Sequence, residues 1–195
     1  MTVYHGTDSI SANNILDTGI NVKYGNESVD NAAGFYMTPN KTFAMQRAKM
    51  AAARVRSFHK GEVVEPAVLE IELDLSDAGS LRIKEFDGCS YEWKEFVFYN
   101  RLGWRFLRKW ALFSKNHNLD AKYDIVIDET ADAGVNDIIS DSRYRNDLGD
   151  LTSIIMQIER STRPDWDKQV SLHTARAVRS CVRSIRIVPN EECLN

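Results

Sequence analysis

Apolar residues recur along the chain at two different spacings, which predicts a mixture of strands and helices. Residues 68–75 alternate strictly between apolar and polar, as in a half-buried strand. The β-branched run at residues 123–127 predicts a central strand. Residues 147–160 place Leu148, Leu151, Ile154, Ile155 and Ile158 on one face, which predicts a helix.

The remaining pattern predicts shorter elements of both kinds. Ser9 or Ser11 is expected to cap a helix that ends at Gly19, after a turn at Gly6 and Thr7. Gly103 is expected to mark a break if residues 91–110 form two helices rather than one. Further strands are expected at residues 2–5, 35–37, 81–83, 170–173 and 184–188, and further helices at residues 42–60, at residues 130–140 and from residue 174 onward. Because strands and helices mix without a regular alternation, the fold class is predicted to be α+β.

Composition limits the classes of protein to consider. The 195 residues are 43% hydrophobic and 27% charged, and no Pro-, Gly- or Ser-rich linker divides them, which favours one domain over residues 1–195. The net charge of −3 gives no reason to expect nucleic-acid binding. Three widely spaced cysteines, no signal peptide and no long apolar run lead us to expect a cytoplasmic protein without membrane contact.

Two short segments have the residue types that bind and cleave NAD. Residues 4–7 read YHGT and residues 34–38 read GFYMT. A glycine lets a ligand approach the backbone closely, a histidine can hydrogen-bond a ribose hydroxyl, and a tyrosine offers an aromatic face. Cleavage at the nicotinamide bond passes through an oxocarbenium-like state, so the enzyme mainly orients the substrate and stabilises charge.

These segments resemble the diphtheria-toxin-like ADP-ribosyltransferases and the poly(ADP-ribose) polymerases. A closer resemblance, to an uncharacterised bacterial family of the same superfamily, covers most of the chain. Its motifs are W-x-x-F-V-x-x-N-R at residues 93–101, Y-D-I-V at residues 123–126 and Q-x-x-L-H-T at residues 169–174. The resemblance implies an ADP-ribosyltransferase fold, in which two small facing sheets form an NAD cleft with flanking helices.

The resemblance also assigns roles to residues of the NAD site. It implies that His5 binds the adenosine-side ribose, that Gly6 pairs with the nicotinamide amide through its main chain, and that Thr7 supports the loop. Tyr36 would stack on the nicotinamide ring. Arg47 stands where the family has a second tyrosine, and a guanidinium group can also stack on a ring.

The catalytic residue is the main departure from the family. Gln169 stands at the position of the family's catalytic glutamate, and an amide can hydrogen-bond a ribose hydroxyl but cannot act as a base. Glu95 is the leading alternative, with Glu92 and Asp167 behind it. Asp124 and Asp128 flank a predicted strand at a spacing that could bind a metal, but no third ligand is present, so no metal site is expected.

Two functions are compatible with these residues. The first is an NAD-dependent ADP-ribosyltransferase, with NAD as substrate and an unknown macromolecular acceptor. It would be a toxin or effector with an antitoxin or immunity protein as partner, cytoplasmic or delivered into a target cell by a signal-free route. The alternative is a catalytically degenerate module that binds NAD or ADP-ribose without turnover.

Overall fold

The chain forms two compact units, each assembled from segments that lie far apart in the sequence. The computed structural model describes residues 1–24, 29–58, 61–76, 78–109, 115–132, 134–144, 149–160 and 168–189. The first unit consists of Met1–Asn21, Tyr36–Leu81 and Ala175–Asn195, and the second consists of Val22–Phe35 and Arg82–Thr174.

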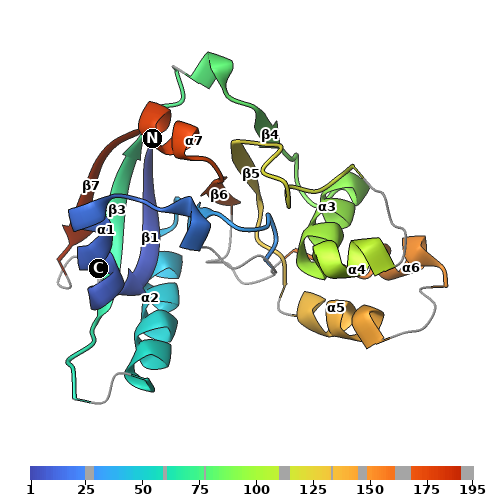
Figure 1. Cartoon of the computed structure of the whole chain (residues 1–195), viewed down its shortest axis with the longest axis horizontal. Coiled ribbons are helices and arrows are strands. Elements are labelled where there is room, and N and C mark those ends of the chain that lie inside the picture. Colours follow the sequence, from blue (N-terminus) through green and yellow to red (C-terminus); the bar gives the residue numbers. More distant parts are fainter. Residues whose placement is uncertain are drawn as a thin grey trace. The chain divides into compact units, whose positions relative to one another are not determined.

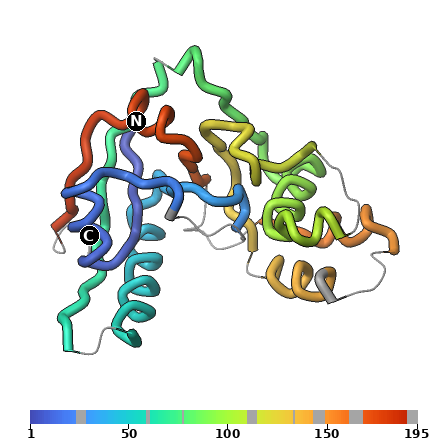
Figure 2. The backbone as a smooth tube through the Cα atoms, viewed as in Figure 1, coloured from blue at the N-terminus to red at the C-terminus, as the bar shows by residue number. Residues whose placement is uncertain are grey.

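The first unit contains a three-stranded antiparallel sheet with the order β1-β3-β7 (Figure 1). The strands are β1 (Thr2–Asp8), β3 (Pro66–Leu73) and β7 (Val182–Val188). The colours of Figure 2 show that they come from the beginning, the first half and the end of the chain. β1 pairs with β3 over its whole length, from Thr2 opposite Glu72 to Asp8 opposite Pro66.

Helices on both sides of this pairing complete the first unit. α1 (Ser9–Thr18) contacts β3 and β7, and α2 (Lys41–Arg56) contacts β1 and β3. α2 begins after Asn40, whose side chain accepts a hydrogen bond of 3.0 Å from the Phe43 amide, so the first turn of the helix is capped. The short helices η2 (Ala78–Ser80) and α7 (Ala175–Cys181) contact each other.

The second sheet has the order β2-β6-β5-β4. Its strands are β2 (Phe35–Met37), β6 (Lys168–Leu172), β5 (Ile125–Glu129) and β4 (Ile83–Glu85). β5 lies inside the sheet, parallel to β4 and antiparallel to β6, which confirms the predicted central strand. The chain passes from the second unit into the first within β2, between Phe35 and Tyr36.

Helices of the second unit pack around an apolar core. Trp93, Phe96 and Val97 of α3 (Tyr91–Leu102) are fully buried, and α3 contacts α5 (Val135–Tyr144) and α6 (Leu151–Met156). Gly103 has a positive φ of 79° and separates α3 from α4 (Trp104–Lys109), which confirms the predicted break. The second unit also contains the 3-10 turn η1 (Val22–Tyr24).

Several predicted boundaries differ from the structure. The turn predicted at Gly6 and Thr7 is wrong, because both residues continue β1 and pair with β3. The predicted cap of α1 is also wrong, since Asp8 rather than either serine accepts a 2.9 Å hydrogen bond from the Ser11 amide. Four further elements are shifted or shortened relative to their prediction. They are β4, predicted at residues 81–83, α2 at residues 42–60, α5 at residues 130–140 and α6 at residues 147–160. Of these predicted ranges, residues 59–60, 133 and 147–148 lie outside the described stretches.

The architecture confirms the predicted fold class at the level of α+β with two small sheets and flanking helices. Within the described stretches, no helix is both long enough and apolar enough to cross a membrane.

Candidate functional site

The first unit brings the two predicted NAD-binding segments together. The Tyr4 amide donates to the Thr38 carbonyl at 2.7 Å, and the Thr38 amide donates back to the Tyr4 carbonyl at 2.9 Å. One residue further along β1, His5 Nδ1 lies 2.7 Å from the Tyr36 carbonyl oxygen. His5 and Tyr36, 31 positions apart in sequence, are therefore joined directly.

The contact with Tyr36 determines which His5 nitrogen has the proton. A carbonyl oxygen only accepts hydrogen bonds, so Nδ1 must be the donor. Burial lowers the pKa of His5, the bond to the Tyr36 carbonyl opposes this, and the positive charge of Arg47 lowers it further. His5 is therefore neutral near pH 7 and presents Nε2 as a hydrogen-bond acceptor.

Gly6 has a structural role that was not expected from the sequence. A Cβ atom at this position would lie 1.8 Å from the Ala44 carbonyl oxygen and 2.8 Å from the Ala48 amide nitrogen. Both are backbone atoms of α2, so only glycine permits the observed approach of helix and strand. The predicted main-chain contact of Gly6 with nicotinamide stays a prediction beside this packing role.

Thr7 and Arg47 occupy different environments in the first unit. Thr7 is buried on β1 opposite Ala67. Arg47 is exposed on α2, with its guanidinium carbon 5.9 Å from the centroid of the Phe43 ring. The five residues predicted to bind NAD therefore all belong to this unit, and their contacts with NAD stay predictions.

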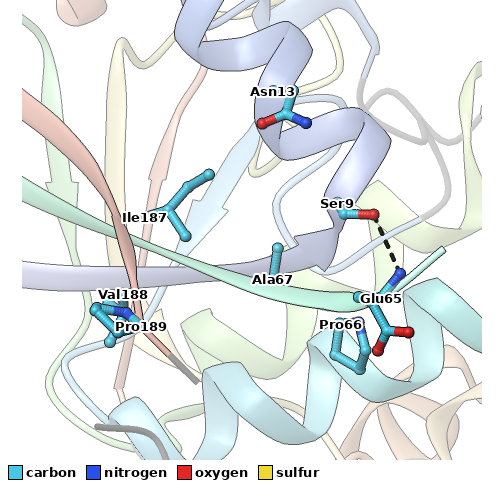
Figure 3. A pocket seen from close by; sticks show the side chains of 8 residues that line it. All are labelled: Ser9, Asn13, Glu65, Pro66, Ala67, Ile187, Val188 and Pro189. Carbon is cyan, nitrogen blue, oxygen red and sulfur yellow. Dashed lines mark hydrogen bonds between the residues drawn. The ribbon is translucent and has the colours of Figure 1, made fainter. Parts of the chain in front are cut away.

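A pocket of the first unit lies apart from these residues. It is formed where α1 meets the ends of β3 and β7, and Figure 3 shows Ser9 hydrogen-bonded to the Glu65 amide at its edge. The lining residues are Ser9, Asn13, Glu65, Pro66, Ala67, Ile187, Val188 and Pro189. Since neither His5 nor Tyr36 contributes to it, this pocket is not the predicted NAD site.

The second unit contains a buried polar network centred on Asp30, of which only 5% is exposed. Arg101 Nε donates to Asp30 Oδ1 at 2.5 Å, and the Ala131 amide donates to Oδ2 at 3.2 Å. Asn100 Nδ2 donates to the main-chain oxygen of Asp30 at 2.9 Å. The carboxylate is thus paired with a cation inside the protein, as a buried charge requires.

Gln169, the predicted counterpart of the family's catalytic glutamate, belongs to this network. Its side-chain amide donates to Asp30 Oδ2 at 3.4 Å and to the Glu129 carbonyl at 3.5 Å. Gln169 is buried on β6, directly opposite Asp128 of β5. Its amide group is therefore bound to protein atoms of the second unit.

Asp128 is a second buried carboxyl group in the same network. Asn31 Nδ2 donates to Oδ1 at 2.9 Å, and the Trp93 indole donates to Oδ2 at 3.1 Å. Burial raises the pKa of Asp128 to about 8, and the charge of Asp30 adds to this rise against the hydrogen bonds that Asp128 accepts. Asp128 is therefore largely protonated at pH 7.

His173 closes the network at the end of β6. Its Nδ1 lies 2.8 Å from the Ala33 carbonyl, so Nδ1 has the proton, and Nε2 lies 2.9 Å from the Ser171 hydroxyl oxygen. Burial lowers the pKa of His173 to about 4, so the ring is neutral at pH 7. The same hydroxyl oxygen accepts a 3.0 Å bond from Asn31 Nδ2.

Glu95 lies on a different side of α3 from this network. Its carboxylate accepts a 2.8 Å hydrogen bond from Asn116 Nδ2. The indole of Trp93 reaches Asp128, and two helical positions differ in direction by about 200°. The structure therefore does not bring Glu95 and Gln169 together. Glu92 is exposed and paired with Lys84 at 2.5 Å, and Asp167 lies outside the described stretches.

Sequence reasoning missed Asp30, Asn31 and Asp128 as members of one buried cluster. The first two lie in a polar stretch that predicts only a loop, and the sequence around Asp128 suggests no role for it beyond that of a metal ligand. The available signal was the pair Asn100 and Arg101 within a mostly apolar helical pattern, since an arginine that is largely removed from water requires a carboxylate partner.

Comparison with known proteins adds the family. A family model described as "Protein of unknown function (DUF3990)" matches residues 1–183, and the chain belongs to this family. No curated protein matches the chain, and no solved structure does.

Proposed function

We propose that this member of the DUF3990 family is an NAD-dependent ADP-ribosyltransferase. The reaction would break the bond between nicotinamide and ribose and join ADP-ribose to a macromolecular acceptor. The observation that supports it best is the 2.7 Å contact between His5 Nδ1 and the Tyr36 carbonyl. It joins the two segments that resemble the NAD site of this superfamily and leaves the imidazole in the form that can accept a hydrogen bond.

The proposal gives each residue of the first unit a defined contact. A ribose hydroxyl would donate to His5 Nε2, since Nδ1–H is bound to Tyr36. The phenol ring of Tyr36 would stack on nicotinamide, and the guanidinium of Arg47 would offer a second flat surface. Gly6 would read the nicotinamide amide through its main chain, while Thr7 supports the strand end.

The proposal has two candidates for charge stabilisation, Gln169 and Glu95. The amide of Gln169 already donates to Asp30 and to a main-chain carbonyl. Glu95 accepts from Asn116 on another side of α3. These contacts favour a second candidate function, in which the chain binds NAD or ADP-ribose without turnover.

The binding part of the proposal is tested by thermal unfolding with and without NAD. A ligand that binds only the folded state raises the melting temperature by mass action, so NAD is expected to raise it for the wild-type protein. Tyr36→Ala and His5→Ala should each weaken binding by about 1–3 kcal/mol, the cost of losing a buried hydrogen-bonding or stacking partner. Tyr91→Ala, an exposed tyrosine of α3, is the matched control. Equal shifts in all four proteins would contradict the proposal.

The enzymatic part is tested by the release of nicotinamide from labelled NAD in the presence of cell lysate. Protease and nuclease digestion of the labelled material would identify the acceptor as protein or nucleic acid. An antitoxin or immunity protein is the expected partner if the acceptor is essential to the cell. NAD binding without nicotinamide release would favour the binding module over the transferase.

A further inference from the structure

The motif W-x-x-F-V-x-x-N-R acts on one short segment of the second unit. Asn100 and Arg101 both donate to Asp30, to its main-chain oxygen and its carboxylate respectively. Trp93 is linked to the same segment through Asp128, because the Trp93 indole and the Asn31 side-chain amide both donate hydrogen bonds to the Asp128 carboxyl group. Two residues of this motif therefore bond to Asp30 directly, and the third bonds to Asp128, the carboxyl group that Asn31 also contacts.

The motif Q-x-x-L-H-T acts on the same segment from β6. Gln169 donates to the Asp30 carboxylate at 3.4 Å, and His173 donates to the Ala33 carbonyl at 2.8 Å. At Gly34 a Cβ atom would lie 2.7 Å from the His173 ring and 3.0 Å from the Leu172 carbonyl oxygen. Residues 30–34 are thus held in contact with β6, and the close approach at Gly34 excludes a larger residue.

Residues 30–34 lead directly into β2 and the proposed NAD-binding tyrosine. Phe35 is the last residue of the second unit before the chain enters the first, and Tyr36 comes next. Tyr36 provides the carbonyl that orients His5, and in the proposed function it provides the ring that stacks on nicotinamide. Fixing residues 30–34 therefore limits the backbone positions open to Tyr36.

We propose that the two motifs form a clamp on residues 30–34, and that Asn100, Arg101, Gln169 and His173 are positioning residues for Tyr36. This inference rests on the proposed function, because it concerns NAD binding at Tyr36. It assigns Gln169 to holding the chain rather than to contact with the ribose. Supporting residues of this kind decide whether a site is held tightly enough to work.

The first test breaks the clamp at its ion pair and measures hydrogen–deuterium exchange and NAD binding by calorimetry. In Arg101→Gln, amides of residues 29–36 should exchange faster, and exchange in β3 should stay at the wild-type rate. The NAD dissociation constant should rise about tenfold, equivalent to about one hydrogen bond. Arg186→Gln, which breaks an exposed pair with Glu70, should leave both readouts unchanged.

A purely structural role for the network predicts a different result. Unchanged exchange at residues 29–36, or faster exchange with an unchanged dissociation constant, would overturn the clamp. If Arg101→Gln does not fold, Arg101→Lys keeps the charge beside Asp30 and is compared by the same measurements. A wild-type protein that binds no NAD would refute the proposed function itself. Equal NAD binding by the wild type and by Arg101→Gln would refute only the clamp.

Gln169→Glu separates positioning from catalysis. The new carboxylate would lie beside that of Asp30 in a buried site, and like charges repel there. The clamp therefore predicts weaker NAD binding and nicotinamide release lower by about 100-fold, the cost of misplacing a group by about 1 Å. A true counterpart of the family's glutamate would instead release nicotinamide faster with unchanged exchange at residues 29–36, and that result would overturn the assignment.

Discussion

The two units bury different kinds of group at their candidate residues. In the first unit, β1 and α2 meet through small and apolar side chains, and the key polar contact is a single histidine bonded to a main-chain carbonyl. In the second unit, two carboxyl groups, Asp30 and Asp128, are almost fully buried beside Gln169. Close packing dominates one region, and a hydrogen-bonded network dominates the other.

The difference suggests separate tasks for the two regions. The Nδ1–H group of His5 is bonded to a main-chain carbonyl, so Nε2 is the ring nitrogen that can accept a hydrogen bond, whereas the carboxyl groups of Asp30 and Asp128 accept hydrogen bonds from protein donors. Buried networks of this kind specify one backbone arrangement because breaking any member leaves another unsatisfied. We therefore expect the first unit to bind the ligand and the second to hold the chain that leads to it.

The largest expected effect is a pH dependence of stability in the second unit. Asp128 has a pKa of about 8 in the folded protein and near 3.8 when unfolded, so between these values the folded form binds an extra proton. The free energy of unfolding should therefore fall as pH rises, by about 1.4 kcal/mol for each pH unit from this group. All four tryptophans lie within residues 82–174, so urea unfolding followed by tryptophan fluorescence reports on this unit.

Asp128→Asn isolates this contribution. The asparagine amide is uncharged like the protonated acid but does not titrate. The free energy of unfolding of Asp128→Asn should therefore decline less than that of the wild type between about pH 4 and 8. The neutral His173, with a pKa lowered to about 4, has the opposite influence, because its stabilising contribution grows as pH rises from about 4 to 6.5. That contribution is present in both proteins and cancels in their difference. Parallel pH profiles for the wild type and Asp128→Asn would show that Asp128 is not protonated in the folded state.

The next effect concerns the close packing of the first unit. Gly6→Ala places a methyl group against backbone atoms of α2, 1.8 Å from the Ala44 carbonyl oxygen, so the helix must move. Overpacking of this kind costs about 1–3 kcal/mol, which urea unfolding followed by circular dichroism would measure. Gly79→Ala is the control, because a Cβ there meets no atom within 4 Å. Equal stability of the two variants would mean that α2 does not approach β1 this closely.

How far the sequence predicts this fold depends on how local each signal is. The break at Gly103 was predicted because a glycine between two apolar helical patterns is a local signal, and its φ of 79° confirms it. Gly6 was assigned to ligand binding, while its contact with Ala44 depends on a helix 38 residues away. The pair Asp30 and Arg101 is separated by 71 positions, so the polar stretch around Asp30 predicted only a loop.

The division into two units escapes prediction for the same reason. Each unit is assembled from separate stretches, so no single change in composition along the chain marks a boundary. The segments with His5 and Tyr36 were recognisable as short motifs, and they are adjacent in the fold. The role predicted for Glu95 depended instead on which side of α3 this residue occupies, and in the structure its carboxylate accepts a hydrogen bond from Asn116.

The smallest expected effect compares one capping residue in each unit. Asp8 caps α1 and Asp150 caps α6, and each accepts a hydrogen bond from the amide three residues later, at 2.9 Å for Asp8 and 3.2 Å for Asp150. Asp8 is buried and also accepts from the Ser11 hydroxyl at 2.7 Å, whereas Asp150 is exposed. Loss of a helix cap costs about 0.5–2 kcal/mol, with the larger cost where the freed amide is shielded from water.

Asp8→Ala should therefore lower the free energy of unfolding by about 1–2 kcal/mol, and Asp150→Ala by about 0.5 kcal/mol. Both are measured by urea unfolding, with circular dichroism for the whole chain and tryptophan fluorescence for the second unit. Asp8→Asn keeps the capping oxygen and should recover most of the loss. A greater cost for Asp150→Ala would reverse the comparison, because it would mean that the exposed end of α6 contributes more than the buried junction between β1 and α1.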